Sequence, residues 1–437
     1  MGRHVGAARF AFNQCLALVK AGLDGRSRDG SVQVPWSRFD LINAFNGWKR
    51  SAAAGRVLVA DPAGVTEVVA TGLAWRGEVC QQVFEEAAVD LGRGLDAFAG
   101  SRRGPRPGRV GFPRFKRKNA AVGSFRIRNK TNSAGICSVR VGEKAPRSVT
   151  LPKIGVLAVR EDTRRLRRML ANGRATIMSA TVTYRRGSGR WTVSIIVEAA
   201  DLHPAAQHQP RPEGDTGRWI GIDRGLAALV VAAGADGSQV LRVDDSPRPL
   251  RAGMTRLQHL SRRVSRRQKG SANRRKAVAR LARQHMRIRN IRHEFLHTVA
   301  RQLVKTHDRL VLEDLNVTGM TANHRLAAAI SDAGWAQLAH ILVYQQAWRG
   351  GQVMFADRWY PSTKTCSRCG TLATAVPLAV RVFGCACCGL VLDRDVNAAV
   401  NLATWAECHA RVRDPQAGGP VTNAYRGAIP TPTPTRG

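Results

Sequence analysis

The amino-acid sequence predicts a multidomain α+β protein, because three kinds of pattern follow one another along its 437 residues. Apolar residues recur at helical spacing from Val5 to about Ser101. An alternation with a period of two follows between Ser124 and Val197, which is typical of strands. From Trp219 onward, short strand-like runs alternate with helical stretches, which indicates an α/β domain.

The charge of the chain narrows the choice of partners. There are 69 Lys and Arg against 31 Asp and Glu, which gives a formal charge of +38. Nucleic acid is the usual polyanion for so basic a chain. An anionic membrane is the alternative, which is disfavoured because we find no run of about 18 apolar residues and no signal peptide. We therefore expect a cytoplasmic, nucleoid-associated protein that binds nucleic acid.

A basic segment follows the first helical region. Residues 102–130 contain eleven Lys or Arg, no Asp or Glu, and three phenylalanines around the sequence GFPRFKRK. The cations suit contacts with RNA phosphates. Two roles stay open for Phe112, Phe115 and Phe125, namely stacking on bases and anchoring of the segment to a core. The candidate nucleic-acid contacts in this segment are Arg114, Lys116, Arg117 and Lys118.

The strand pattern is clearest in residues 176–198. There the runs IMSATVTY and RWTVSIIVE flank the turn Gly187-Ser188-Gly189, which predicts a β-hairpin. A short antiparallel sheet or barrel is the natural packing for such strands. Residues 199–217 are rich in Pro, His and Gln without apolar periodicity, and this composition indicates a linker.

After the linker, strands are predicted at 219–233, 239–243, 309–315 and 351–356, with a helix at about 331–349 and a cationic helical stretch before it. That stretch contains fifteen Lys or Arg and no Asp or Glu between Arg251 and Arg292. The alternative, a solvated charged face, normally mixes both signs. We therefore expect nucleic-acid contacts from this stretch, with the candidates Arg262, Arg263, Arg266, Arg267, Lys269, Arg274, Arg275 and Lys276.

Five of the nine cysteines cluster in one short segment, which argues for a metal site in a reducing compartment rather than a disulfide framework. The sequences CSRCG and CACCG supply two CxxC pairs, Cys366 with Cys369 and Cys385 with Cys388. Four thiolates can hold one Zn²⁺ tetrahedrally and leave no position for water, so we expect a structural zinc. The spacing alone leaves open a register that uses Cys387.

Three acidic residues lie at the ends of apolar strands or beside a helix start. They are Asp223 in WIGIDRGLAALVV, Glu313 in RLVLEDLNV and Asp395 in VLDRDVNAAVNLA. A carboxylate inside a strand costs desolvation energy unless it is paired or binds a metal. Each acid alone fits a structural role as well as a catalytic one. Together they can bind two Mg²⁺ ions about 3.5 to 4 Å apart, an arrangement that hydrolyses phosphodiester bonds.

The ordered set GIDRGL, LVLEDLNVTGM, PSTKTCSRCG, FGCACCG and DRDVNAAVNLA resembles the RuvC-type nuclease and zinc-ribbon end of the transposon-encoded TnpB proteins. These are RNA-guided DNA endonucleases related to compact type V CRISPR effectors. The resemblance extends to RHVGAARFAFNQCL, GFPRFKRK, LPKIG, RWTVSIIVE and the long basic stretch, so it covers nearly the whole chain. Each motif alone is weakly specific, whereas the set in this order is highly specific.

The resemblance implies a fold and a set of domain boundaries. It implies an RNase H-like RuvC nuclease domain with an inserted zinc ribbon, preceded by a helical recognition domain and a wedge-type β-barrel. Family members usually begin with a strand and a short helix ahead of the segment matched by GRHVGAARF, so the wedge would lack one strand if that element is absent. The expected parts are the recognition domain at 1–101, the wedge at 102–198, the linker at 199–217, the nuclease domain at 218–358 and 391–408, the zinc ribbon at 359–390, and a disordered tail at 409–437.

The resemblance also implies an activity. Asp223, Glu313 and Asp395 would be the catalytic, Mg²⁺-binding residues, and Asp393 a neighbour without a catalytic role. Asn397 and Asn401, four residues apart on the expected helix, are candidates to orient Asp395, with capping or packing as an equal alternative. The partners would be a guide RNA derived from the transposon end and double-stranded target DNA. The alternatives are a guided repressor, a compact type V CRISPR effector and a transposase that joins DNA ends.

Overall fold

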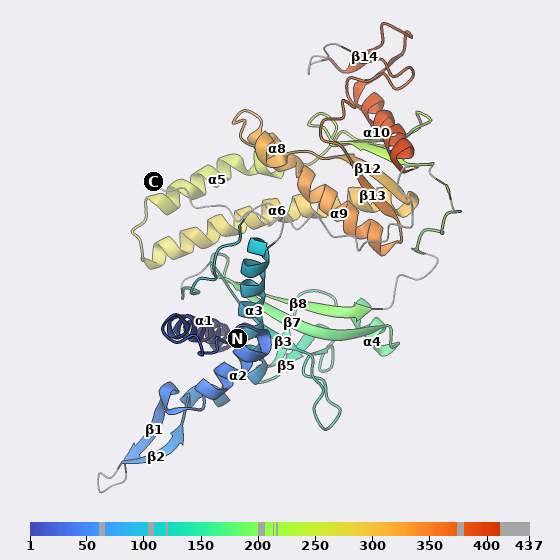
Figure 1. Ribbon diagram of the computed structural model, residues 1–437. Helices are drawn as coiled ribbons and strands as arrows, with labels where there is room; N and C mark the ends of the chain where they lie inside the picture. The colour runs from blue at the N-terminus through green and yellow to red at the C-terminus, as the bar shows by residue number, and fades with distance from the viewer. Residues whose placement is uncertain are drawn as a thin grey trace. The chain divides into compact units, whose positions relative to one another are not determined.

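The computed structural model describes residues 1–60, 66–103, 109–118, 121–199, 206–212, 214–215, 217–373 and 380–410. The chain divides into two compact units, Met1–Ala200 and Asp201–Gly437, which Figure 1 shows and which are described here one by one. The boundary falls at the start of the predicted linker, whose residues 200–205 lie outside the described ranges, as does the predicted tail from residue 411 onward. The finer division into recognition, wedge, nuclease and ribbon domains stays a prediction.

The first unit begins with helices. These are α1 (Gly2–Arg28), α2 (Arg38–Trp48) and α3 (Gln81–Arg103), with two short 3₁₀ helices, η1 (Ala52–Ala54) and η2 (Ala74–Gly77). A capping box begins α2, because the Ser37 side chain accepts from the Asp40 amide and the Asp40 carboxylate accepts from the Ser37 amide. Between α2 and α3 lies an antiparallel hairpin, β1 (Arg56–Ala60) and β2 (Thr66–Thr71). The predicted helical region therefore also contains strands.

The strands of the first unit form two further sheets. One has the order β3-β7-β8 (Val122–Arg128, Ala175–Arg185, Arg190–Ala199), and the other has the order β4-β5-β6 (Arg140–Val141, Ser148–Leu151, Gly155–Ala158). The short helix α4 (Arg164–Ala171) precedes β7. The predicted hairpin is present, because β7 pairs antiparallel with β8 from Ala175↔Ala199 to Arg185↔Arg190.

The predicted closed barrel is wrong for the described residues, where the two three-stranded sheets do not join. Helices α1 and α3, together with strand β5 of the second sheet, share one hydrophobic core with β3 and β7. Ile127 of β3 and Val182 of β7 lie in one hydrophobic core with Leu16 of α1 and with Phe84 and Leu91 of α3. Because α1 and α3 already cover the apolar face of the sheet, the sheet has no need to close on itself.

The second unit contains a five-stranded sheet with the order β11-β10-β9-β12-β13. The central strand β9 (Ile220–Asp223) pairs antiparallel with β10 (Val230–Gly234) and parallel with β12 (Arg309–Glu313). The edges are β11 (Gln239–Val243) and β13 (Gln352–Ala356). The run predicted as one strand at 219–233 is thus two strands joined by a turn. The predicted strands at 239–243, 309–315 and 351–356 are confirmed within two residues at their ends.

Helices cover both faces of this sheet. On one face, Val396 and Val400 of α10 (Arg394–Ala410) pack against Val231 of β10. On the other face, α6 (Ala272–Thr306) and α9 (Trp335–Trp348) share a core with the sheet. The backbone of α10 lies so close to β9 that a Cβ atom at Gly221 would come within 1.9 Å of the Ala399 carbonyl oxygen. Glycine is therefore required at this position of β9.

Three helices and one hairpin complete the second unit. The helix α5 (Pro249–Ser265) pairs with α6, and the short helices α7 (Val317–Met320) and α8 (Ala327–Ala333) lie between β12 and α9. The hairpin of β14 (Val382–Gly384) and β15 (Val391–Asp393) leads directly into α10. Among the helices that the structure describes, we find none that is both long and apolar enough to cross a membrane.

Candidate functional site

The three predicted acids lie at one end of the five-stranded sheet, where two of its inner strands finish. The parallel strands β9 and β12 lie side by side and end at Asp223 and Glu313, while Asp395 is the second residue of α10, which packs against β9. Burial, together with the negative charges of Glu313 and Asp395, raises the pKa of Asp223 well above its ordinary value. The Asp223 carboxylate therefore lies within electrostatic reach of those of Glu313 and Asp395.

Asp395 lies among charges of both signs. Burial and the neighbouring Asp393 raise the pKa of the Asp395 carboxyl, and the Arg381 guanidinium lies 3.7 Å from Asp395 Oδ1. Both oxygens of the Asp393 carboxylate are hydrogen-bonded. Its Oδ1 accepts from the backbone amides of Asp395 (2.9 Å) and Val396 (3.1 Å). Its Oδ2 accepts from Arg242 at 3.1 Å. Asp393 thus begins helix α10 and fixes the position of Asp395.

Two residues that the sequence did not single out hold Glu313. The Ser362 hydroxyl donates a hydrogen bond of 2.6 Å to Glu313 Oε1, and the Ser362 residue is only 2% exposed. The buried guanidinium of Arg224 donates to the backbone carbonyls of Glu313 and, at 3.1 Å, of Trp335. Arg224 therefore ties the end of β9 to the end of β12. Both residues lie inside quoted motifs, GIDRGL and PSTKTCSRCG, but their partners are distant in sequence.

The two asparagines of α10 hold the loop that carries Ser362. Asn401 Nδ2 donates to the carbonyls of Ser362 (2.7 Å) and Thr365 (2.6 Å), and Asn397 Nδ2 donates to Thr365 at 2.8 Å. The amide of Ser367 donates to Asn397 Oδ1 at 2.9 Å. Among the described residues, neither asparagine is hydrogen-bonded to Asp395. The hypothesis that they orient Asp395 directly is therefore wrong, and they instead fasten residues 362–367 to the helix that carries it.

The four predicted zinc ligands form one cluster. The Sγ atoms of Cys366, Cys369, Cys385 and Cys388 all lie within 4.8 Å of one another. The separations Cys366–Cys388 and Cys369–Cys385 are both 3.6 Å, close to the roughly 3.8 Å between the corners of a tetrahedron with Zn–S bonds of about 2.3 Å. Cys387 is exposed and lies outside this cluster, so the register that uses Cys388 is the one adopted.

The two CxxC pairs have the same local geometry. The Gly370 amide donates to the Cys366 carbonyl (2.9 Å), and the Gly389 amide donates to the Cys385 carbonyl (3.0 Å). Both glycines have positive φ, 74° and 69°, a conformation that glycine adopts without strain. Hydrogen bonding with Thr371 lowers the pKa of Cys369 to about 6, whereas burial and hydrogen bonds with the other three thiols raise the pKa of Cys388 to about 12. Cys369 rather than Cys388 therefore favours the thiolate that a metal requires.

The candidate nucleic-acid contacts fall on two surfaces. Eight of them, from Arg262 to Lys276, lie at the end of α5, in the turn and at the start of α6, and six of these eight residues are exposed. Across the part of the chain that the structure describes, none of the twelve candidate cations forms an ion pair with an acid. Unpaired, exposed cations are available to phosphates. Lys116 differs from the other candidates because its ammonium already contacts an aromatic ring, 3.8 Å from the Phe12 ring centroid.

The phenylalanines of the basic segment divide between the two open roles. Phe125 is buried in the core of the first unit, and Phe112 packs edge-on against Phe98 with ring centroids 5.2 Å apart. These two rings anchor the segment. Phe115 is 48% exposed, with the Lys20 ammonium 4.9 Å from its ring centroid. Stacking on a base thus stays open for Phe115 alone.

Two family models match successive parts of the second unit. The family of IS605 OrfB proteins, described as "Probable transposase", matches residues 202–324, and the Cas12f1-like TNB domain matches residues 335–402. A Mycobacterium tuberculosis protein (strain H37Rv) is 31% identical, with 98% of this chain and 86% of the relative aligned. A Streptomyces pristinaespiralis protein is 42% identical over 51% of this chain and 52% of the relative. The name of each begins "Putative RNA-guided DNA endonuclease".

A solved structure, the cryo-EM structure of a Cas12f1–sgRNA–target DNA complex, also aligns with this chain. The sequence identity is 16%, the alignment covers 74% of this chain and 70% of the other, and the TM-score is 0.44.

Proposed function

The chain belongs to the TnpB family of transposon-encoded proteins, and from this premise we propose that it is an RNA-guided DNA endonuclease with Asp223, Glu313 and Asp395 as its catalytic acids. The observation that carries the proposal is that three carboxylates lie at the same end of the sheet. Two of them end strands, and the third is in the first turn of a helix. Burial and the charges of Glu313 and Asp395 raise the pKa of Asp223, and a carboxylate in such surroundings is costly to a fold. Such a cluster is typical of an active site.

The donor set fits a hard divalent cation. Carboxylate oxygens are the ligands that Mg²⁺ prefers. Burial first, and then the charge of neighbouring acids, raises the pKa of Asp223 and of Asp395, and a bound cation would favour the ionised form of both. Asp223, Glu313 and Asp395 would hold the ions. When bound, two Mg²⁺ ions activate a water and stabilise the leaving oxygen of a phosphodiester.

The chain's own residues prepare this site. Ser362 donates to one oxygen of Glu313 and so leaves the other oxygen free for a ligand. Arg224 holds the backbone at the end of β12, and its positive charge opposes the rise in the pKa of Asp223. Asp393 holds the first turn of α10 and so fixes Asp395. These contacts keep the acids in position before substrate arrives, which is what precise placement of catalytic groups requires.

The four cysteines would hold a structural zinc, because their thiolates fill its coordination shell. The partners in this proposal are a guide RNA from the transposon end and a double-stranded DNA target chosen by base pairing. The cationic surfaces at residues 114–118 and at the α5–α6 turn would contact their phosphates. The formal charge of +38 suits a protein that holds two nucleic acids at once.

The test is cleavage by the purified protein with RNA transcribed from the element's own end. We expect Asp223→Asn to abolish guided cutting and to leave RNA binding unchanged. The matched control is Asp236→Asn, which alters an exposed acid in the turn between β10 and β11, at the other end of the sheet from Asp223, and should cut at the wild-type rate. A protein with Asp223→Asn that still cut guided DNA at the full rate would overturn the assignment.

A further inference from the structure

Two histidines of α6, within the second unit, face each other. His293 and His297 are four residues apart, so they lie on the same side of the helix. Their Nε2 atoms are 3.2 Å apart, and their ring centroids are 4.3 Å apart. His293 is exposed and His297 is half-buried. An ion from solvent can therefore reach the two nitrogens.

The separation of these nitrogens suits two ligands of one metal ion. Zn–N bonds of about 2.0 to 2.1 Å at a tetrahedral angle place two ligand nitrogens about 3.3 Å apart. In the absence of a metal, one Nε2 atom has to carry a proton and donate it to the other, because two lone pairs at this distance repel each other. A metal ion can take the place of that proton with a small rotation of the rings.

The local sequence matches a known zinc-binding pattern. Residues 293–297 read HEFLH, the H-E-x-x-H pattern in which two histidines on one helix face bind zinc. The residue between them also matters for charge. Helix α6 contains ten Lys or Arg and a single acid, and that acid is Glu294. Its carboxylate offsets part of the repulsion between the cations of the helix and a divalent ion.

Two residues of α9 contact the other ring nitrogen of His297. Tyr344 Oη lies 3.3 Å from His297 Nδ1 and 3.4 Å from its Nε2, and Gln345 Nε2 lies 3.1 Å from Nδ1. A histidine that binds a metal through one nitrogen donates the N–H of the other nitrogen to an oxygen. Tyr344 offers that oxygen, whereas Gln345 donates to Nδ1 when the proton is on Nε2. The surroundings therefore accommodate both the metal-bound and the metal-free tautomer.

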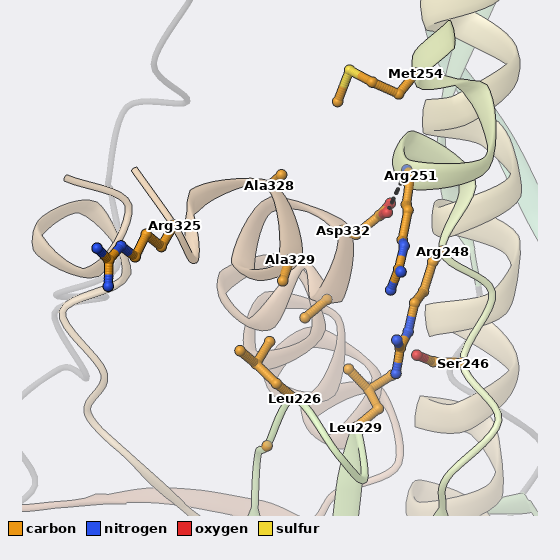
Figure 2. A pocket seen from close by; sticks show the side chains of 12 residues that line it. Leu226, Leu229, Ser246, Arg248, Arg251, Met254, Arg325, Ala328, Ala329 and Asp332 are labelled. Carbon is orange, nitrogen blue, oxygen red and sulfur yellow. Dashed lines mark hydrogen bonds between the residues drawn. The ribbon is translucent and has the colours of Figure 1, made fainter. Parts of the chain in front are cut away.

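The backbone next to this pair is held in place. The Arg292 guanidinium donates a hydrogen bond to the backbone carbonyl of Ser331 in α8. The next residue of α8, Asp332, is buried and accepts two hydrogen bonds from backbone amides at the start of α5, of which Figure 2 shows the one to Arg251. Helix α8 thus joins α5 to α6 immediately before His293. A rigid backbone keeps two ligands at the spacing that a metal requires.

We propose that His293 and His297 bind one zinc ion, at a second site separate from the four cysteines. In the described residues, the cysteine cluster is the only group of three or more His, Cys, Asp or Glu side chains placed to share an ion. The histidine site therefore has two protein ligands, and water completes the shell. Catalytic zinc uses three protein ligands, so this is a binding site and not a second active site. The inference does not depend on the proposed nuclease activity.

The experiment measures zinc bound by the full chain without an affinity tag, dialysed against increasing Zn²⁺. The matched variant is His293→Ala, and zinc bound elsewhere cancels in the comparison because both proteins keep the cysteines and the carboxylate cluster. We expect the wild type to bind one equivalent more than the variant. The affinity for this equivalent should fall at least about tenfold in His293→Ala, because losing a ligand costs no less than losing a partner of a ligand.

The control is His285→Ala, which removes an exposed histidine of α6 that has no second histidine four residues away. It should keep the additional zinc. Thermal melting provides a second readout, because a ligand that binds only the folded state stabilises it. Excess Zn²⁺ should raise the melting temperature of the wild type and of His285→Ala more than that of His293→Ala. An undiminished additional zinc in His293→Ala would overturn the proposal. Equal losses in both variants would show adventitious binding by surface histidines and would overturn it too.

Discussion

Removing the Ser362 hydroxyl tests how the active-site geometry is maintained. Ser362→Ala deletes the 2.6 Å hydrogen bond to Glu313 Oε1 at a site where the residue is 2% exposed, so water has little access to replace it. A hydrogen bond to a charged group contributes about 1.5 to 3 kcal/mol. Because about 1.4 kcal/mol corresponds to tenfold, we expect the loss to be about 10- to 100-fold in Mg²⁺ affinity or cleavage rate.

The assay is guided cleavage over a Mg²⁺ titration. If Ser362 positions a metal ligand, Ser362→Ala shifts the half-maximal Mg²⁺ concentration upward, and saturating Mg²⁺ restores part of the rate. The matched control is Ser367→Ala, which removes a hydroxyl from the same loop and keeps the backbone amide that donates to Asn397. A Ser362→Ala protein with the wild-type rate and the wild-type Mg²⁺ dependence would refute the reasoning.

Three further outcomes are expected. Asn401→Ala should lower the free energy of unfolding by about 2 to 3 kcal/mol, because it leaves the Ser362 carbonyl without its hydrogen-bond donor. Urea denaturation measures this beside the exposed control Asn273→Ala. Equal stability of the two variants would contradict the prediction. In Mg²⁺-free buffer, the raised pKa of Asp223 means that its stabilising contribution is present at acid pH and is lost as the pH rises through the folded-state pKa. Asp223→Asn should therefore melt higher than wild type at neutral pH, with the difference vanishing near pH 4, and a constant difference would refute the sign. Cys385→Ser should abolish stoichiometric zinc in elemental analysis, whereas Cys387→Ser should retain it; the reverse would assign the other register.

The sequence could predict features that depend on local patterns. Hairpin β7–β8 follows from alternation around a glycine turn, and the cysteine cluster follows from two CxxC pairs at suitable spacing. The three acids could be proposed because strand ends and a helix start place them on one sheet edge. The hairpin and the cysteine cluster need only residues that are neighbours in the sequence or repeat a known spacing, whereas the three acids are distant in sequence and were grouped by the order of the motifs that contain them.

Other features depend on contacts between distant segments. Ser362 and Glu313 are 49 residues apart, and Arg224 reaches the Glu313 carbonyl across 89 residues. The run at 219–233 was predicted as one strand although Asp223, Arg224 and Gly225 interrupt its apolar residues, and β9 ends at the first of these three. The prediction of a closed barrel was wrong for a similar reason. The packing of α1 and α3 on the sheet depends on contacts between distant segments, which the alternation within a strand does not reveal.

The central claim is that guide RNA directs cleavage by the Asp223, Glu313 and Asp395 cluster. The most direct measurement supplies the protein with two RNAs that differ only in the guide portion, and offers both matching DNA duplexes to each complex. The account predicts that the cut duplex changes with the guide and that Glu313→Gln and Asp395→Asn each remove cutting. Cleavage that ignores the guide sequence, or that survives both substitutions, would contradict it.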